Sequence, residues 1–353
     1  MTVAVDTTAP VRVLRTPAVV AVLATLLAVA VVVSLGVGAE VLPVGTVVDA
    51  VRARLAQTPA DLGVDTIVWE LRLPRALLAV VVGAGLALAG AAVQTLVRNP
   101  LADPYLLGVS SGAAVGATLV ITAGAFAAAG IWALSTGALA GAFGAGVLVF
   151  AIATAQGGLT PLRLVLTGTV LGAAFSAIAS YLVFRSPDPA AAQSVLFWLL
   201  GSVAGADWER VWTAAAAVAV AVVLLVAGSG WLDALAAGPD TAAALGVPVT
   251  AVRRALFALL AVLVGVLVAV SGGIGFVGLV LPHLARLLVG ARHRALLPVA
   301  ALGGALFLLA VDVLARVLVR PTELPLGVVT GLVGAPVFLL LMGRRRYRFG
   351  SQG

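Results

Sequence analysis

The sequence contains no cysteine and no lysine, and it has only two histidines. Without cysteine the chain can form no disulfide, no thiolate nucleophile and no cysteine–zinc site. All 21 basic residues are arginine. This excludes a Walker A phosphate loop, a Schiff base and a pyridoxal anchor, because each of these needs a lysine. Any ATP hydrolysis that this protein uses must therefore come from another polypeptide.

Charge of either sign is also scarce. Charged residues make up 10% of the 353 positions, whereas hydrophobic residues make up 62%. A soluble globular protein carries about 25% charged residues, so water cannot be the only solvent of this chain. The net charge of +7 does not indicate a nucleic-acid partner, because the arginines stand at the ends of apolar segments, where they set membrane orientation. We predict an all-α, polytopic protein of the bacterial cytoplasmic membrane, in contact with lipid.

Intervals of about 20 residues with little or no charge mark the candidate membrane helices. Residues 104–162 are long enough for two spans with a turn near 124–131. The SGGIG sequence at 271–275 is expected to break residues 255–285 into a long and a short span. The other intervals are Thr16–Ala39, 76–97, 164–184, 211–232, 295–319 and 324–342. The pattern therefore predicts about ten transmembrane helices.

An even number of spans places both termini on the same side of the membrane. Arg12, Arg15 and the RRRYR run at 344–348 make that side cytoplasmic by the positive-inside rule. The expected organisation is, in order, a cytoplasmic tail (1–15), a single transmembrane domain (16–343) with external segments at about 40–72 and 185–210 and a cytoplasmic loop at 233–250, and a basic cytoplasmic tail (344–353).

The stretch GPDTAAALGVPV at 238–249 reads like a piece of soluble protein within an apolar chain. Pro239 and Asp240 favour a helix start, and Gly246 can stop the helix little more than one turn later. The orientation given above places this stretch between the sixth and seventh spans. The sequence thus predicts a short, sharply terminated helix in the cytoplasm.

Two groups of charged residues stand near the outer ends of spans. Arg72 and Arg75 are three positions apart in WELRLPR. Arginines of this kind often extend to lipid headgroups, but arginine is normally depleted on the external side. Asp312 and Arg316 lie four apart on the ninth span, so they share a helix face and can form an ion pair. Because an ionisable residue inside a membrane is a functional candidate, a proton-relay role for Asp312 is the alternative.

The remaining polar features have structural explanations. Asp103 can cap the third span. His283 has no cysteine or second histidine nearby, so a packed histidine is favoured over a metal ligand, and no metal site is expected. Residues 43–58 and the external segment that contains Phe197 and Trp198 are predicted to form helices that lie along the membrane interface.

Several ordered motifs between about Trp69 and Met342 resemble those of the FecCD family. They are LRLPRALLAVVVGAGLALAGAAVQTLVRNPLADPYLLGVSSGA, FWLLGS, AAALGV, SGGIGFVGLVLPHLAR and ELPLGVVTGLVGAPVFLLLM. Members of this family are permease subunits of type II ABC importers for ferric siderophores, haem and cobalamin. The resemblance implies a second permease subunit, two cytoplasmic ATP-binding subunits that hold ATP and Mg, and an external substrate-binding protein. It implies no cofactor on this chain.

The resemblance also assigns roles to residues that match the family's motifs. It implies that the cytoplasmic loop after the sixth span docks in a groove of the ATPase, and that external arginines pair with acidic residues of the binding protein. It places the inner gate at the turn before the fifth span, and it makes the fifth and tenth spans line the path. The residues are Asp233, Gly238, Pro239, Asp240, Thr241, Ala243, Leu245 and Gly246 for ATPase coupling, Arg72, Arg75 and Arg316 for docking, and Thr160 and Pro161 for the gate.

Three functional hypotheses follow. The first is a non-catalytic permease subunit of an ATP-driven importer, with a ferric siderophore as the expected cargo because it is the commonest in the family; haem and cobalamin stay open. The second is an ion-coupled secondary transporter that uses Asp312 as its proton site. This scheme gives the short cytoplasmic helix no role. The third, a membrane enzyme, lacks a plausible nucleophile–base pair or metal cluster.

Overall fold

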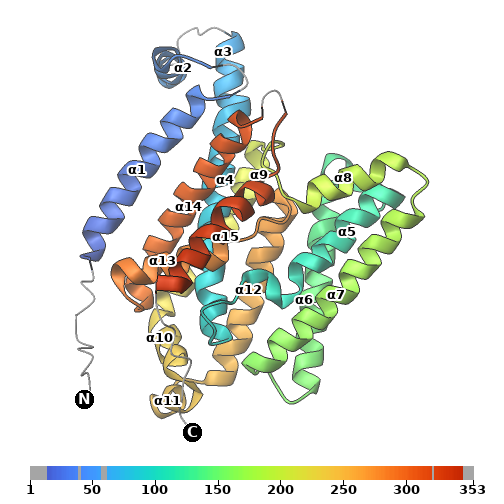
Figure 1. Ribbon diagram of the computed structural model, residues 1–353, viewed down its shortest axis with the longest axis vertical. Coiled ribbons are helices and arrows are strands. Elements are labelled where there is room, and N and C mark those ends of the chain that lie inside the picture. Colours follow the sequence, from blue (N-terminus) through green and yellow to red (C-terminus); the bar gives the residue numbers. More distant parts are fainter. Residues whose placement is uncertain (1–13, 39–40, 57–61, 320–321, 345–353) are drawn as a thin grey trace, which may run out of the picture.

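A computed structural model describes residues 14–38, 41–56, 62–319 and 322–344. Every regular element among these residues is a helix, so the prediction of an all-α chain is confirmed for the part described (Figure 1). Most of the two expected cytoplasmic tails, with residues 345–348 of the RRRYR run, lies outside the described residues. The same holds for residues 39–40, 57–61 and 320–321 of the expected external segments.

Seven helical stretches among the described residues are long and apolar enough to cross a membrane. They are α1 (Thr16–Gly36), α3 (Leu62–Thr66) continued by η1 (Ile67–Arg72) and α4 (Leu73–Leu96), η3 (Ala127–Trp132) with α6 (Ala133–Ala155), α7 (Pro161–Arg185), α9 (Trp208–Ala227), α12 (Val249–Ser271) and α14 (His293–Val317). Shorter apolar helices are α5 (Val109–Ala123), α8 (Pro189–Leu199), α13 (Val277–Val289) and α15 (Leu326–Arg344). The rest are α2 (Val44–Ala56), η2 (Pro104–Leu107), α10 (Ser229–Ala237) and α11 (Pro239–Ala244). A total of about ten spans, and their sidedness, stay predictions.

Helix α4 forms the axis of the molecule, with α9, α12, α13 and α14 packed around it (Figure 1). Glycines allow its backbone to approach its neighbours. A Cβ atom at Gly83 would lie 2.3 Å from the carbonyl oxygen of Gly304 on α14, and one at Gly90 would lie 1.9 Å from that of Gly278 on α13. Neither distance is sterically possible for a real side chain. Because lipid offers no hydrophobic force between helices, such close contacts are a main source of stability in a membrane bundle.

Helices α5, α6, α7 and α8 form a second group beside this axis (Figure 1). Their contacts use the same device, since a Cβ at Gly116 of α5 would lie 1.9 Å from the carbonyl oxygen of Gly137 on α6. Most of α7 is nevertheless exposed: only 22% of its most apolar window is buried, compared with 78% for the stretch that contains α4. The bundle is therefore closed around α4 and open along α7.

The helix break expected at SGGIG is present between Ser271 and Val277. The exposed backbone groups of the break find partners in other segments. The hydroxyl of Tyr105 accepts a hydrogen bond from the Ile274 amide at 2.8 Å and donates one to the Ile274 carbonyl at 3.0 Å. The amide of Ser202 donates to the carbonyl of Ser271 at 2.8 Å. Irregular backbone is tolerated at membrane depth only when it is satisfied in this way.

Three boundaries differ from the sequence-based expectation. The second span, expected at 76–97, begins earlier, because π-helix η1 continues directly into α4, with Pro74 in its first turn. The sixth span ends at Ala227 rather than Leu232, since Gly228 separates it from α10, which is uncharged as far as Asp233. Asp103 caps η2 instead of the third span, by accepting from the Tyr105 amide at 2.8 Å. Burial raises the pKa of Asp103 to about 6.

Candidate functional site

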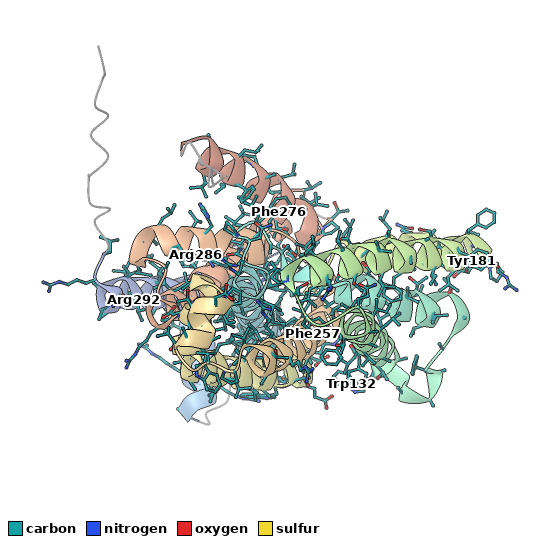
Figure 2. The ribbon with its side chains drawn as sticks, turned by 90° about the horizontal axis from the view of Figure 1, so that it is seen from below. Trp132, Tyr181, Phe257, Phe276, Arg286 and Arg292 are labelled. Carbon is teal, nitrogen blue, oxygen red and sulfur yellow. The ribbon has the colours of Figure 1, made fainter. Side chains whose placement is uncertain are left out.

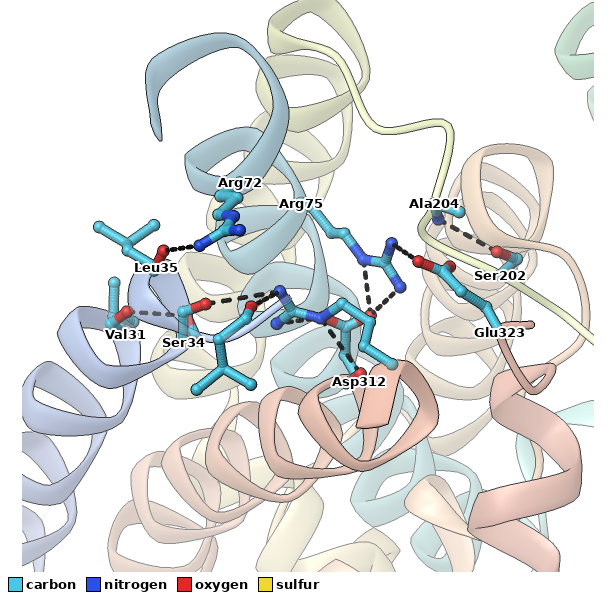
Figure 3. Close-up of polar contacts among 11 residues, drawn as sticks. Val31, Ser34, Leu35, Arg72, Arg75, Ser202, Ala204, Asp312 and Glu323 are labelled. Carbon is cyan, nitrogen blue, oxygen red and sulfur yellow. Dashed lines mark hydrogen bonds and ion pairs between the residues drawn. The ribbon is translucent and has the colours of Figure 1, made fainter. Parts of the chain in front are cut away.

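Four charged side chains meet where α4, α14 and the loop before α15 come together. Here they are called the arginine cluster, and they are Arg75, Asp312, Arg316 and Glu323 (Figure 3). One oxygen of Asp312 lies 2.9 Å from Arg75, and the other lies 3.0 Å from Arg316. Glu323 is 2.9 Å from Arg75 on the remaining side of that guanidinium. The pair predicted from the spacing of Asp312 and Arg316 is thus present, within a larger network.

Asp312 is the buried centre of the arginine cluster, with 0% of its side chain exposed. A buried carboxylate is tolerated only when its charge is paired and hydrogen-bonded, and loss of one partner is strongly destabilising. Two guanidinium groups supply this pairing here. Asp312 therefore holds α4 and α14 together at this end of the bundle.

The arginines of this region also bind the end of α1. Arg316 donates to the carbonyl of Val37 at 2.7 Å, and Arg72 donates to the carbonyl of Leu35 at 2.7 Å. The last carbonyls of a helix have no partner within it, and cations at a helix C-terminus also interact well with its dipole. The three arginines predicted for docking are therefore brought to one place. Arg316 is only 6% exposed and lies beneath the others.

The short helix predicted at 238–249 is found at the opposite end of the bundle (Figure 1). Gly238 and Gly246 bound α11 with φ angles of 126° and 78°, which side chains other than glycine rarely adopt. Ala242 is fully buried against α10 and α12, whereas Leu245 is 69% exposed. The helix is thus fixed to the bundle on one face and presents an apolar side chain outward on the other.

Asp233, on α10, ties this region to the core of the bundle. Its carboxylate accepts from the His293 amide at 2.9 Å and lies 2.6 Å from Nδ1 of the same residue. The other ring nitrogen of His293 is 2.8 Å from the hydroxyl of Thr95, near the end of α4. The residue expected for ATPase coupling is therefore bonded to the first residue of α14 and, through it, to α4.

Thr160 and Pro161, the residues expected at the inner gate, form the start of α7. The Thr160 hydroxyl accepts from the Arg163 amide at 3.4 Å, and Pro161 occupies the first turn. A helix cap accounts for both residue types. The gate assignment therefore stays a proposal.

Two residues of these sites, Glu323 and His293, were not identified as functional candidates from the sequence. Glu323 lies in a loop between two spans, and His293 follows three loop residues at the start of a span, so neither belongs to a helical spacing pattern with its partner. No group of three or more histidine or acidic side chains within the described residues could hold a metal ion. His283 is buried, as a packed histidine would be.

Comparison with known proteins adds the family. The model of the FecCD transport family matches residues 26–344. The chain belongs to the FecCD transport family. Among the relatives of this FecCD chain is the cobalamin import system permease protein BtuC of Halobacterium salinarum, 42% identical over 284 residues that cover 80% of this chain and 75% of the relative. The vitamin B12 import system permease protein BtuC of Citrobacter koseri is 41% identical over 282 residues, with 80% and 84% covered.

Solved structures agree with the assignment. A metal-chelate type ABC transporter in an inward-facing conformation matches this FecCD chain with a TM-score of 0.82 and 36% identity, over 93% of this chain and 100% of the other. PsaBC from Streptococcus pneumoniae shares the fold alone, with a TM-score of 0.55 and 19% identity over 76% of this chain and 90% of the other. The chain is thus a multi-pass membrane permease of the ABC-importer kind. A siderophore cargo is not confirmed.

Proposed function

We propose that this FecCD-family permease pairs with a second permease subunit and, driven by separate ATP-binding subunits, imports cobalamin delivered by an external binding protein. The cobalamin relatives, about 42% identical over four-fifths of the chain, support this cargo over the siderophore expected from family frequency. A ferric chelate is the second candidate, because a metal-chelate type transporter shares the fold at a TM-score of 0.82. In this scheme the permease itself catalyses no reaction.

The observation that carries the importer scheme is the form of α11. It is a six-residue helix, closed at both ends by glycines and packed by Ala242 on α10 and α12, with Leu245 pointing outward. A short rigid helix transmits a push from an ATPase, whereas a flexible loop would absorb it. The bond from Asp233 to His293 links this region to α14, so a displacement of α11 acts directly on the bundle.

The second permease subunit is proposed to cover α7 and α15. Large apolar side chains of α7 recur on one exposed stripe, with Leu162, Leu166 and Val170 between 54% and 68% exposed. Tyr181 of the same helix points away from the molecule (Figure 2). Helix α15 likewise exposes Leu332 and Leu339.

The same helix α7 is proposed to line the translocation path. Its hydroxyl side chains Thr169, Ser176 and Ser180 are exposed. Hydroxyls among apolar groups, without fixed charge, suit a path that must release a bulky cargo.

The binding protein is proposed to dock at the opposite end from α11, with acidic side chains toward Arg72 and Arg75. Arginine suits this contact because its planar guanidinium can hold a carboxylate through two parallel bonds. Arg316 supports the surface from beneath by holding Asp312. The alternative of a proton-coupled transporter is disfavoured, because Asp312 is fully buried and both of its oxygens lie within 3.0 Å of guanidinium nitrogens.

Uptake by proteoliposomes tests this function. The wild-type chain is reconstituted with its ATPase and binding protein and supplied with radiolabelled cyanocobalamin or a labelled ferric siderophore. We expect ATP-dependent uptake of cobalamin and at least a tenfold loss in Gly246→Trp, because a bulky residue is strained at the φ of 78° found at the end of α11. Gly230→Ala, in the open space along α10, is the control. Uptake that persists without ATP or without the ATPase would refute the importer.

A further inference from the structure

The two acidic side chains of the arginine cluster, Asp312 and Glu323, differ in burial, in location and in their ion pairs. Asp312 is fully buried on a long helix, and its oxygens face two guanidiniums. Glu323 stands in the loop before α15, its side chain is 40% exposed, and its one ion pair within the described residues is to Arg75. The Arg75 side chain is 12% exposed. The outer side of this guanidinium is therefore covered by a carboxylate that solvent and a partner can reach (Figure 3).

We propose that Glu323 is an internal substitute for the carboxylate of the docking partner. In the undocked permease it occupies Arg75, and an acidic side chain of the binding protein replaces it on docking. The proposal rests on the docking role given to Arg75 above. A partly exposed ion pair is weak and easily exchanged, whereas the buried contact of Arg75 with Asp312 is retained and keeps the guanidinium in place for the incoming carboxylate.

The exchange has a consequence for α15, because Glu323 lies three positions before the first residue of that helix. Two bonds seat this start on the turn after α8: the Leu326 amide donates to the Gly201 carbonyl at 2.9 Å, and the Gly327 amide donates to the Leu200 carbonyl at 2.8 Å. The same turn holds the end of α12 through the Ser202 amide. Release of Glu323 thus removes the attachment of this loop to α4, while the Leu324 amide still holds the loop to α14 by donating to the Ala315 carbonyl at 3.1 Å.

Affinity measurements test the exchange. The binding protein that delivers cargo to this permease is titrated against the permease–ATPase complex in nanodiscs. If Glu323 occupies Arg75 about nine-tenths of the time, it weakens the apparent affinity of the permease for the binding protein about tenfold. We therefore expect Glu323→Gln to bind the partner about tenfold more tightly. Glu209→Gln is the control, because it removes the same charge from an exposed site at the same end of the bundle. Glu209 lies at the start of α9, where the Trp208 side chain donates to the Trp69 carbonyl. The affinity of the Glu209→Gln permease for the binding protein should change less than twofold.

Combining Glu323→Gln with Arg75→Gln separates the docking role of Arg75 from the substitute role of Glu323. Arg75→Gln should weaken docking, and adding Glu323→Gln to it should then have no further effect. If Glu323→Gln leaves affinity unchanged or lowers it while Arg75→Gln weakens docking, the substitute role of Glu323 is wrong and the docking site stands. If Arg75→Gln leaves docking unchanged, the docking site itself is wrong, and the exchange fails with it.

A second measurement needs no change in affinity. The chain has no cysteine, so Thr322→Cys accepts a single spin label next to Glu323. We expect the label to become more mobile in the Glu323→Gln background, and also in the wild-type background when the binding protein is added. A label whose spectrum is the same in all three states would overturn the exchange.

Discussion

Helices α4 and α7 have almost the same length and similar composition, yet α4 is the axis of the bundle and most of α7 is exposed. Of their most apolar windows, 78% is buried in the stretch containing α4 and 22% in α7. Gly83 and Gly90 of α4 touch the backbone of helices α14 and α13, whereas α7 makes its close backbone contact at Gly168, with the Leu106 carbonyl of the short η2. In a chain whose solvent is lipid, apolar character does not separate the interior from the surface. Close backbone contacts and buried ion pairs do.

The largest expected effect breaks the interior side of this comparison. Gly90→Ala should prevent stable folding, because the new Cβ would lie 1.9 Å from the Gly278 carbonyl oxygen, and the backbone cannot yield as a side-chain tip would. Gly144→Ala on α6 makes the same change in a helix where nothing lies within 4 Å, and it should be neutral. Yield and monodispersity on size-exclusion chromatography compare them. Equal behaviour would show that the α4 contact is not essential.

A smaller effect is expected at the arginine cluster, which closes the ends of α4 and α14. Asp312→Asn should lower the free energy of unfolding by about 3–5 kcal/mol, because the buried Arg316 loses its carboxylate and Arg75 keeps only the partly exposed Glu323. Asp65→Asn removes the exposed pair with Arg54, at 3.2 Å, and should cost at most about 1 kcal/mol. Thermal unfolding in detergent measures both. A cost for Asp312→Asn no larger than that of the control would contradict its bridging role.

The smallest effect on folding is expected on α7. Val170→Asp should leave the helical circular-dichroism signal unchanged but convert a permease dimer into a monomer, since a charge would enter the proposed subunit contact. Val223→Asp on α9, at 65% exposure against 67% for Val170, places the same charge on another exposed face and should leave the dimer intact. Light scattering gives the masses. If both variants remain dimers, or if both become monomers, α7 is not the specific interface between the subunits.

Local signals in the sequence predicted much of this architecture. The helix break at 271–275 and the limits of α11 followed from glycine and proline, which act through their own backbone angles and need no knowledge of the fold. The pair of Asp312 and Arg316 followed from one turn of helix. Arg75 was expected at the surface, and nothing in its neighbours along the chain indicated its bond to Asp312, 237 positions away.

Contacts across the fold explain what could not be predicted. Glu323 and His293 acquire their partners only when distant helices come together, and η1 extends α4 backward past Pro74 because its backbone adopts a wider helix that charge counting does not detect. Boundaries based on charge alone also joined Gly228 and the start of α10 to the sixth span. The family resemblance supplied roles for residues, but packing decides which of them are reachable.

One feature of α4 and α14 has a mechanical meaning. The pair is fastened at one end by Arg75 and Asp312, at the other by Thr95 and His293, and in the middle by the contact of Gly83 with the backbone of α14. Helix α14 is about 37 Å long at 1.5 Å per residue. Two rods fixed at three points cannot slide along or twist past each other. They can only tilt as one lever, so a small rotation at either end becomes a displacement of the other end.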